Sequence, residues 1–206
     1  MMQIRASQLG KKYQREWIFK NFSLTLTEGN SYALLGPNGS GKTTLMLILS
    51  GLLSPSKGKI EYLNKKKTIE EEAFYQYLSI VAPYQEVIEE FTLQELLDFH
   101  FSLKRPQENM GTTDVMKAMY LEQARHKYVR QFSSGMKQRL KLGLAFYAQD
   151  NILFLDEPCS NLDAKGIKWY QQEVRKILSQ RIVIVCSNQP YEYEFTQEKI
   201  DIEQYK

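Results

Sequence analysis

The segment around residues 31–53 constrains this chain more than any other part of it. An apolar run at 31–35 leads into Gly-Pro-Asn-Gly-Ser-Gly-Lys-Thr at positions 36–43, and an apolar stretch at 44–53 follows. The pattern G-x-x-x-x-G-K-[ST] occurs by accident in on the order of one in a hundred chains of this length. Here it lies between a run typical of a buried strand and a stretch typical of a helix, which is the context that a phosphate-binding loop requires.

The chemistry of phosphate binding explains why these residue types occur in this order. Glycine lets the backbone curl so that N–H groups point at phosphate oxygens, and the following helix offers its positive N-terminus to the anion. Lys42 is expected to reach the β- and γ-phosphates and to act in catalysis, and Thr43 to bind Mg²⁺ through its hydroxyl. The candidate nucleotide-binding residues of the loop are Gly36, Pro37, Asn38, Gly39, Ser40, Gly41, Lys42, Thr43 and Thr44.

Two carboxylates follow a second apolar run at 152–155, where Asp156 and Glu157 precede a proline. In open α/β sheets, ligands bind at the carboxyl ends of the strands. We therefore expect Asp156 to hold Mg²⁺ through water, and Glu157 to orient and polarise the water that attacks the γ-phosphate. The alternative is an ordinary strand followed by an exposed acidic turn, which is a common arrangement.

Apolar spacing over the rest of the chain predicts an α/β fold. Alternation at 2–8 and 18–26 indicates half-buried antiparallel strands, and Thr92 with Glu95 resembles a capping box at the start of a helix. Strands that alternate with helices imply a parallel sheet. Further strands are expected at 60–63, 78–82, 152–155 and 182–186, a turn at 65–67, and helices at 44–53, 93–101, 115–121, 134–148 and 164–178.

These elements predict one domain over residues 1–206, a P-loop NTPase core with a mostly parallel sheet. An antiparallel β lobe is expected at about 1–33 and 58–82, and an inserted helical lobe at about 86–134. The rest of the chain is expected to form the P-loop core.

Charge and composition exclude several classes of protein. The 27 Lys and Arg against 24 Asp and Glu leave a net charge of +3, which is too mild to favour a nucleic-acid partner. No stretch reaches the roughly 18 apolar residues of a membrane span. The N-terminus lacks the apolar core of a signal peptide, so we expect a cytoplasmic protein. Cys159 and Cys186 lack metal-ligand spacing and are expected to be reduced and buried.

The order of the motifs resembles the ATP-binding-cassette (ABC) family. Between the phosphate loop and the two carboxylates, residues 132–136 read Phe-Ser-Ser-Gly-Met, where the family usually has Leu-Ser-Gly-Gly-Gln. Gln138 and Arg139 follow in the register that the family keeps. Residues 160–163, Ser-Asn-Leu-Asp, resemble the family's D-loop. The resemblance covers nearly the whole chain.

The resemblance implies the ATP-hydrolysing subunit of a transporter, acting as a head-to-tail dimer with a second, identical or different, ATPase subunit. Each ATP would lie between one phosphate loop and the partner's signature motif, contributed by Ser133, Ser134 and Gly135, with Asp163 of the D-loop nearby. Tyr13 falls where the family stacks an aromatic ring on adenine, and Trp17 is the competing candidate.

The resemblance also implies transmembrane permease subunits, which would hold the protein at the cytosolic face of a membrane. Glu86, Glu89 and Glu90 would line the groove that receives a helix of the permease, and an acidic groove suits a basic helix. The alternative is a solvated acidic loop.

The sequence departs from the family at three sites. Ser134 and Met136 replace a glycine and a glutamine of the signature. Gln85 is the nearest candidate for the glutamine that links Mg²⁺ to the helical lobe, although it lies about two positions late; the alternative is an exposed loop residue. Asn188 takes the place of the switch histidine; its amide can donate a hydrogen bond to the γ-phosphate but cannot carry a proton, so we expect slow hydrolysis.

Two other functions are compatible with a phosphate loop but fit the rest of the sequence less well. A soluble cassette ATPase of translation or DNA maintenance would carry two cassettes or long coiled-coil insertions, and this chain shows neither. A P-loop kinase or nucleotide switch would not carry a signature motif and a D-loop. The two histidines, His100 and His126, lie in the predicted helical lobe and are expected to be surface or core residues.

Overall fold

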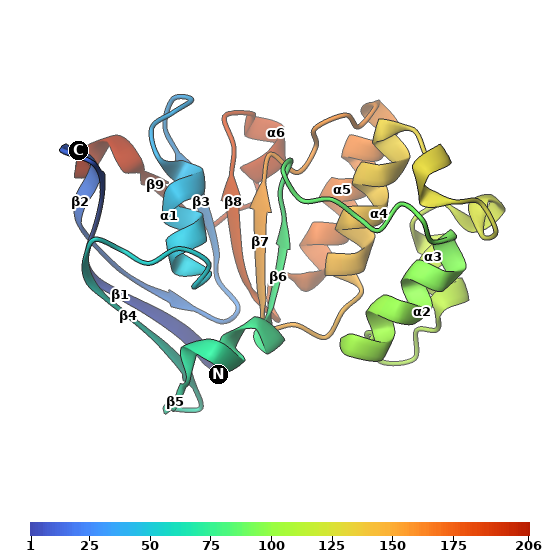
Figure 1. Ribbon diagram of the computed structural model, residues 1–206, viewed down its shortest axis with the longest axis horizontal. Coiled ribbons are helices and arrows are strands. Elements are labelled where there is room, and N and C mark those ends of the chain that lie inside the picture. The colour runs from blue at the N-terminus through green and yellow to red at the C-terminus, as the bar shows by residue number, and fades with distance from the viewer.

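The computed structural model describes the backbone of all 206 residues and every side chain except that of Glu71. Two sheets make up its frame (Figure 1). A four-stranded sheet has the order β2-β1-β4-β5, and a five-stranded sheet has the order β6-β7-β8-β3-β9. The strands are β1 Met2–Tyr13, β2 Glu16–Thr27, β3 Ser31–Leu35, β4 Lys57–Asn64, β5 Lys67–Ile69, β6 Leu78–Val81, β7 Ile152–Asp156, β8 Ile182–Cys186 and β9 Glu198–Asp201.

All pairings in the first sheet are antiparallel and all those in the second are parallel, so the predicted fold class is confirmed. The α-helices are α1 Lys42–Leu49, α2 Leu93–Leu103, α3 Thr112–Ala118, α4 Ser134–Phe146, α5 Ala164–Ile177 and α6 Pro190–Tyr193. Four 3₁₀ segments lie at Glu71–Tyr77, Glu122–Ala124, Val129–Gln131 and Ile202–Tyr205. Over the residues that the structure describes, no helix has both the length and the apolarity needed to cross a membrane.

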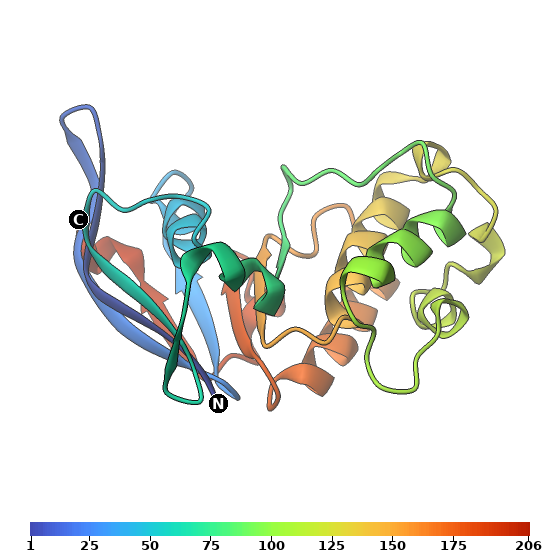
Figure 2. The same ribbon diagram turned by 60° about the horizontal axis from the view of Figure 1, so that its bottom comes forward.

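Helix α1 lies between the two sheets, and α4 and α5 cover the opposite face of the parallel sheet (Figures 1 and 2). The parallel strands are therefore buried on both faces, which explains their nearly continuous apolar sequences. Along β7, Ile152 and Phe154 pack with the core around α1, whereas Leu153 and Leu155 pack with the core of the helices. Because β7, β8 and β3 pair in parallel, the carboxyl end of β7 lies at the same edge of the sheet as the point where β3 leads into the loop before α1.

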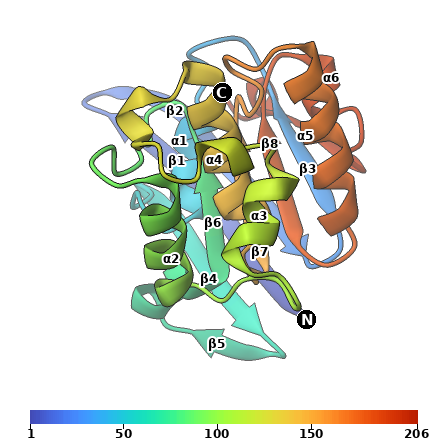
Figure 3. The same ribbon diagram turned by 90° about the vertical axis from the view of Figure 1, so that its right-hand side faces the viewer.

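The helical lobe, α2 and α3, lies outside α4 and α5 (Figure 3). Helix α2 begins with the predicted capping box, because the Thr92 side chain accepts from the Glu95 amide and Glu95 accepts from the Thr92 amide at 2.8 Å. Its Leu93, Leu96 and Leu97 are buried. The lobe thus has the helical period that its leucines predict.

Two cations, the half-buried Lys104 and the buried Arg181, tie the ends of α2 and α4 to residues at the ends of the parallel strands. Lys104, which caps the end of α2, donates to Asp150 at 2.7 Å and to the Leu78 carbonyl at 2.6 Å. Arg181 donates to the carbonyls of Ala145 and Phe146, at 2.9 Å each, at the last turn of α4. Carbonyls in the last turn of a helix lack partners within the helix, and hydrogen bonds to them fix the position of the helix end. Arg181, which directly precedes β8, therefore anchors the end of α4 to the start of that strand.

The structure corrects several expected boundaries. Helix α1 ends at Leu49 and not at 53, because Gly51 takes the left-handed conformation (φ 76°) that terminates helices. Helix α3 begins at Thr112 and ends at Ala118, and Tyr120 lies beyond it with φ 55°. The expected helices at 134–148 and 164–178 end one or two residues early.

The expected antiparallel lobe also needs a correction. Strand β6, which falls within the expected 58–82 segment, pairs in parallel with β7 in the core sheet. The antiparallel partner of β4 is instead β5, and Lys65 and Lys66 form the tight turn between them with φ 48° and 68°. Strand β9 was not predicted; it pairs in parallel with β3 at the edge of the core sheet. A four-residue strand carries too little sequence pattern to be detected.

Candidate nucleotide-binding site

The phosphate loop connects β3 to α1, as predicted. Gly39 and Gly41 have φ values of 78° and 104°, which L-residues rarely adopt. Gly41 caps α1, and a Cβ placed on it would lie 2.4 Å from Ile18 Cγ2. A Cβ on Gly39 would meet no atom within 4 Å, so that side of the loop is open. The loop therefore needs glycine for its backbone at both positions and for close packing at Gly41.

The interior of the loop is electropositive. The side chain of Lys42 is only 8% exposed, and its Nζ donates to the carbonyls of Gly36 at 2.6 Å and Pro37 at 3.1 Å. Among the described residues Lys42 forms no ion pair. The Ser40 hydroxyl is buried without a hydrogen-bond partner. A buried ammonium without a counter-ion and an unused hydroxyl both fit an anion such as a nucleotide phosphate.

Thr43 and Asp156 meet across the loop. The Thr43 hydroxyl donates to Asp156 Oδ2 at 2.7 Å, and Asp156 is 5% exposed. Burial raises the pKa of Asp156, and the charge of Glu157 adds to this, whereas the hydrogen bond from Thr43 and the charge of Lys42 lower it. A hydroxyl and a carboxylate are the hard oxygen donors that Mg²⁺ prefers, so these two residues fit the ion.

Glu157 lies directly beyond β7, in the left-handed region at φ 45°. Its amide donates to the Cys186 carbonyl of β8 at 2.9 Å, which holds the turn against the neighbouring strand. Its side chain is exposed. The loop and both carboxylates line one cleft of about 280 Å³, formed by Ile18, Asn38, Gly39, Ser40, Gly41, Lys42, Thr43, Thr44, Asp156 and Glu157.

Asn188 lies beside the phosphate loop, two residues after β8. Its Nδ2 donates to Asn38 Oδ1 at 2.7 Å. A second cavity of about 400 Å³ includes Asn38 and Glu157 together with Asn188 and Asn161 of the D-loop. Asn188 is therefore brought to the edge of the cleft.

The signature residues do not line this cleft. The Ser133 hydroxyl accepts from the Met136 amide at 3.2 Å and caps α4, while Ser133 and Ser134 are exposed. A Cβ on Gly135 would lie 3.0 Å from the Asn161 carbonyl, so this glycine packs against the D-loop. Met136, which replaces the family's glutamine, packs against the core of the helices. Within one chain, the signature and the phosphate loop remain separate.

Asp163 and Gln85 also lie outside the cleft. Asp163 caps α5, where its Oδ1 accepts from the Gly166 amide at 2.7 Å. Gln85 accepts from the Ala82 amide through Oε1 at 3.1 Å and lines two other cavities, next to Glu86 and Lys141. Its role as a metal ligand stays a prediction.

Tyr84, which directly precedes Gln85, is the neighbour on which the charge of Asp156 acts. Burial, together with the charge of Asp156, raises the pKa of the Tyr84 phenol to about 12. The sequence did not indicate that Tyr84 lies near Asp156, and Tyr84 does not line the nucleotide cleft.

The two adenine-stacking candidates lie near the tip of the β1–β2 hairpin. Tyr13 is 50% exposed, with the Lys11 ammonium 5.3 Å from its ring, and Trp17 is 36% exposed, with two lysine ammonium groups 5.6 Å from its ring. Neither lines the cleft, whereas the neighbouring Ile18 does. The choice between Tyr13 and Trp17 as the stacking ring stays a prediction, and Ile18 was not predicted.

Glu192 is a further residue that the sequence did not indicate. It is 2% exposed, on the short helix α6, and its Oε1 accepts from the Cys159 amide at 2.7 Å. Burial raises the pKa of Glu192, and its polar contacts with Ser187 and Cys159 oppose this. The carboxylate thus joins the segment after β7 to the segment after β8.

The other predicted features are placed as follows. Cys159 and Cys186 are buried free thiols, as predicted. His100 is half-buried, with Nε2 3.2 Å from the Leu144 carbonyl, and burial lowers its pKa; His126 is exposed. Neither histidine lines the nucleotide cleft.

Comparison with known proteins points to one family. A family profile described as "ABC transporter" matches residues 19–160. An uncharacterised ABC transporter ATP-binding protein of Bacillus subtilis, YcbN, is 34% identical over 169 residues, which are 82% of this chain and 55% of YcbN. The lantibiotic transport ATP-binding protein SrtF of Streptococcus pyogenes is 28% identical over 190 residues, which are 90% of this chain and 79% of SrtF.

Solved structures share the fold. A dimeric ATP-binding cassette in a post-hydrolysis state, bound to ADP and Pi, superposes with a TM-score of 0.81 at 21% identity, covering 97% of this chain and 94% of that one. The chain spans about half the length of YcbN and of a second Bacillus subtilis relative, YxlF.

Proposed function

The chain belongs to the ABC transporter family, and from this premise we propose that it is an ATP-binding and ATP-hydrolysing subunit that drives separate transmembrane permease subunits. The observation that carries the proposal is the contact between Thr43 and Asp156, because it joins the phosphate loop to the acidic end of β7 in one cleft. A hydroxyl, a buried ammonium and two carboxylates at one place suit a nucleotide with its metal ion.

In the proposed mechanism, Lys42 exchanges its carbonyl partners for β- and γ-phosphate oxygens. Thr43 and, through water, Asp156 would hold Mg²⁺, which would supply positive charge beside the phosphates. Glu157 accepts a hydrogen bond from the attacking water and orients it toward the γ-phosphate. The Asn188 amide donates a hydrogen bond to a γ-phosphate oxygen but cannot take up a proton as imidazole can, so turnover is slow.

The second half of the site is proposed to come from a partner subunit, identical or different. The exposure of Ser133 and Ser134 supports this, because both lie outside the cleft of their own chain. In a head-to-tail dimer the Ser133 hydroxyl and the Gly135 amide, at the N-terminus of α4, would contact the γ-phosphate bound by the partner. Closure on ATP and opening after hydrolysis would be the mechanical output.

We propose that the permease contacts the groove beside Gln85, which would place the protein at the cytosolic face of a membrane. The acidic character of this groove is weaker than the sequence suggested. Glu89 forms an ion pair with Lys137, and Lys141 lies close enough to Glu86 for their charges to interact. Only Glu90 of the three glutamates is left without such a partner among the described residues. The groove therefore offers mixed charge to a permease helix.

The alternative of a soluble cassette ATPase has no specific observation in its favour. The family profile and the names of relatives such as SrtF refer to transport. A permease partner is therefore preferred over the translation or DNA-maintenance role.

The function is tested by following oligomeric size and phosphate release with ATP and Mg²⁺, for the unaltered protein and for Glu157→Gln. We expect the variant to form an ATP-dependent dimer with at least a 100-fold loss of turnover, because the water loses its orienting carboxylate. Glu194→Gln is the matched control, since Glu194 is exposed and pairs only with Arg175 at 3.5 Å. ATP binding with neither dimer nor phosphate release in either protein would contradict self-sufficient catalysis and require a non-identical partner.

A further inference from the structure

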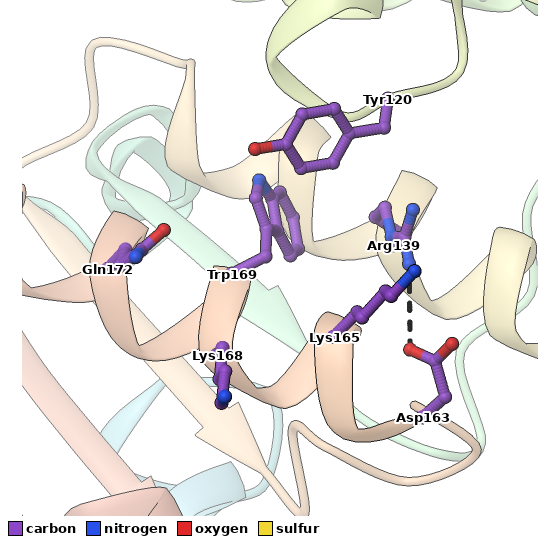
Figure 4. Close-up of a pocket in the computed structure, with 7 residues that line it drawn as sticks. All are labelled: Tyr120, Arg139, Asp163, Lys165, Lys168, Trp169 and Gln172. Carbon is purple, nitrogen blue, oxygen red and sulfur yellow. Dashed lines mark ion pairs between the residues drawn. The ribbon is translucent and has the colours of Figure 1, made fainter.

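A cavity of about 520 Å³ lies away from the nucleotide cleft, between α4, α5 and the loop after α3 (Figure 4). Its volume falls within the range of small-molecule sites, roughly 300–1,000 Å³. No residue of the nucleotide cleft lines it. Its walls include two aromatic rings, three cations and one carboxylate, contributed by Tyr120, Trp169, Arg139, Lys165, Lys168 and Asp163.

The charges of this cavity do not balance. Asp163 is its one acid among the lining residues, and Oδ1 of that carboxylate already accepts from the Gly166 amide at 2.7 Å. The same oxygen lies 3.9 Å from the Arg139 guanidinium, at the outer limit of an ion pair. Lys165 stands in the first turn of α5, where the helix dipole disfavours a cation. The cavity therefore has excess positive charge.

The guanidinium of Arg139 lies against two aromatic rings but lacks a hydrogen-bond acceptor for its buried Nε–H. Its side chain is only 19% exposed, and its centre lies 5.9 Å from the rings of both Tyr120 and Trp169. Its Nε is buried without a hydrogen-bond partner among the described residues. Arginine carries five N–H donors, and a buried donor without an acceptor is costly. A planar, preoriented guanidinium of this kind suits a carboxylate or phosphate.

The aromatic side chains that line the cavity indicate the chemistry of the part of the ligand that does not contact Arg139. The indole N–H of Trp169 is already used, since it donates to the Ala118 carbonyl at 2.8 Å. Trp169 is 3% exposed, so its ring lines the buried side of the cavity, whereas Tyr120 is 71% exposed and lies across from it (Figure 4). Two rings beside a cation favour a flat π-system with an attached anionic group.

We propose that this cavity binds a small organic anion that carries an aromatic ring, with Arg139 as its anion-binding residue. The ligand bridges α4, which begins at the signature motif, and α5, which begins after the D-loop. Its binding fixes the spacing of the two helices. The site stands on the cavity's own residues and does not depend on the proposed ATPase function.

The test uses phenyl phosphate as the probe, with inorganic phosphate and phenol as its two halves. The chain has two tryptophans, so Trp17→Phe leaves Trp169 as the only one to report binding by fluorescence. We expect saturable quenching by phenyl phosphate, with a dissociation constant near or below about 1 mM. Either half alone should bind at least about tenfold more weakly, because each makes only part of the contacts.

Variants in the same Trp17→Phe background locate the site. Arg139→Gln should weaken phenyl phosphate at least tenfold, and Lys165→Gln, an exposed change that keeps the fold, should weaken it severalfold. Arg175→Gln is the control, because Arg175 lies on α5 outside the cavity and pairs with Glu194. Thermal melting checks that each variant is folded.

Three results would overturn the proposal: no quenching by phenyl phosphate, equal binding of inorganic phosphate, or binding that survives both Arg139→Gln and Lys165→Gln. Loss of the signal in Lys42→Ala would also overturn it, because the probe would then occupy the phosphate loop. If the protein fails to bind ATP while phenyl phosphate binds as expected, the proposed function is wrong and the anion site stands.

Discussion

The two motifs that would enclose ATP differ in how complete they are within one chain. In the phosphate loop, Lys42 is buried and Thr43 already contacts Asp156 at 2.7 Å. In the signature turn, Ser133 and Ser134 are exposed, and the Ser133 hydroxyl bonds only within its own helix cap. One half of the site is preformed, whereas the other presents its polar groups to solvent.

The difference separates contacts that form when the chain folds from contacts that would form only when a partner subunit binds. Contacts of the phosphate loop form as the parallel sheet assembles, so they are part of folding. The signature turn is held in position without a ligand: Gln138 on the same helix donates to the Pro158 carbonyl at 2.7 Å. This bond ties the signature helix to the turn that carries Glu157. The signature helix and the turn after β7 are therefore joined by a buried hydrogen bond within one chain.

The largest expected effect comes from disabling each half separately. Lys42→Ala removes the ammonium that contacts the phosphates, and Ser133→Arg places a bulky cation at the exposed signature turn. We expect each variant to lose at least 100-fold in phosphate release, since preorganised phosphate contacts are worth several kcal/mol in the transition state. Only Lys42→Ala should lose binding of a fluorescent ATP analogue to the monomer.

Mixing Lys42→Ala with Ser133→Arg tests whether the phosphate loop and the signature motif of one site come from two different subunits. If the dimer is symmetric, half of the randomly paired molecules combine the intact loop of one variant with the intact signature of the other. Each such dimer holds one working site of two, so the mixture should recover about a quarter of the unaltered rate. A mixture as inactive as its components would contradict a homodimeric site and indicate a non-identical partner.

A smaller effect is expected at Asn188, where the phosphate loop meets the segment after β8. Asn188→Ala removes the donor to the γ-phosphate and should slow phosphate release about tenfold, the value of one hydrogen bond to a charged group. Asn188→His should be faster than the alanine variant and should gain activity as pH rises through about 6.5, where imidazole loses its proton.

Gln189→Ala serves as the control for this position, because Gln189 is the exposed neighbour of Asn188. Unchanged turnover in Asn188→Ala would show that the contact of Asn188 with Asn38 is structural only. Both measurements are steady-state phosphate release at saturating ATP.

The preformed half is also the half that the sequence predicted best. The phosphate loop and the two carboxylates of β7 are local patterns, in which a strand, a turn and the start of a helix follow one another within a few residues. The parallel sheet brings them together without any further information, since the carboxyl ends of parallel strands share one edge.

Features that depend on contacts between distant segments were not predictable in this way. Strand β6 joins the core sheet by pairing with β7, more than seventy residues later in the chain. Gln85 bonds to the Ala82 amide and lines cavities other than the nucleotide cleft, and the sequence does not indicate which way its side chain turns. Glu192 is buried by segments on either side of it, although nothing in its neighbourhood marks it as a core residue.

The smallest effect is expected at Glu192, the buried carboxylate that holds the start of the D-loop through the Cys159 amide. Burial raises its pKa above the ordinary value of 4.5. The stability that protonated Glu192 contributes is therefore complete below pH 4.5 and is lost as pH rises through the raised folded-state pKa. Glu192→Gln keeps the acceptor and removes the charge, so at pH 8 it should stabilise the fold by about 1 kcal/mol, or roughly 2–4 °C.

Thermal melting of both proteins between pH 4 and pH 8 measures this difference, which should shrink toward zero at the acid end. Glu194→Gln, at an exposed position two residues later, should show no such trend. A variant that is less stable than the unaltered protein at pH 8 would mean that the ionised carboxylate stabilises the joint between the two segments. The contact between Glu192 and the Cys159 amide would then be a charged contact that forms during folding, like the contacts of Lys42 in the phosphate loop. The D-loop would be rigid before any partner binds.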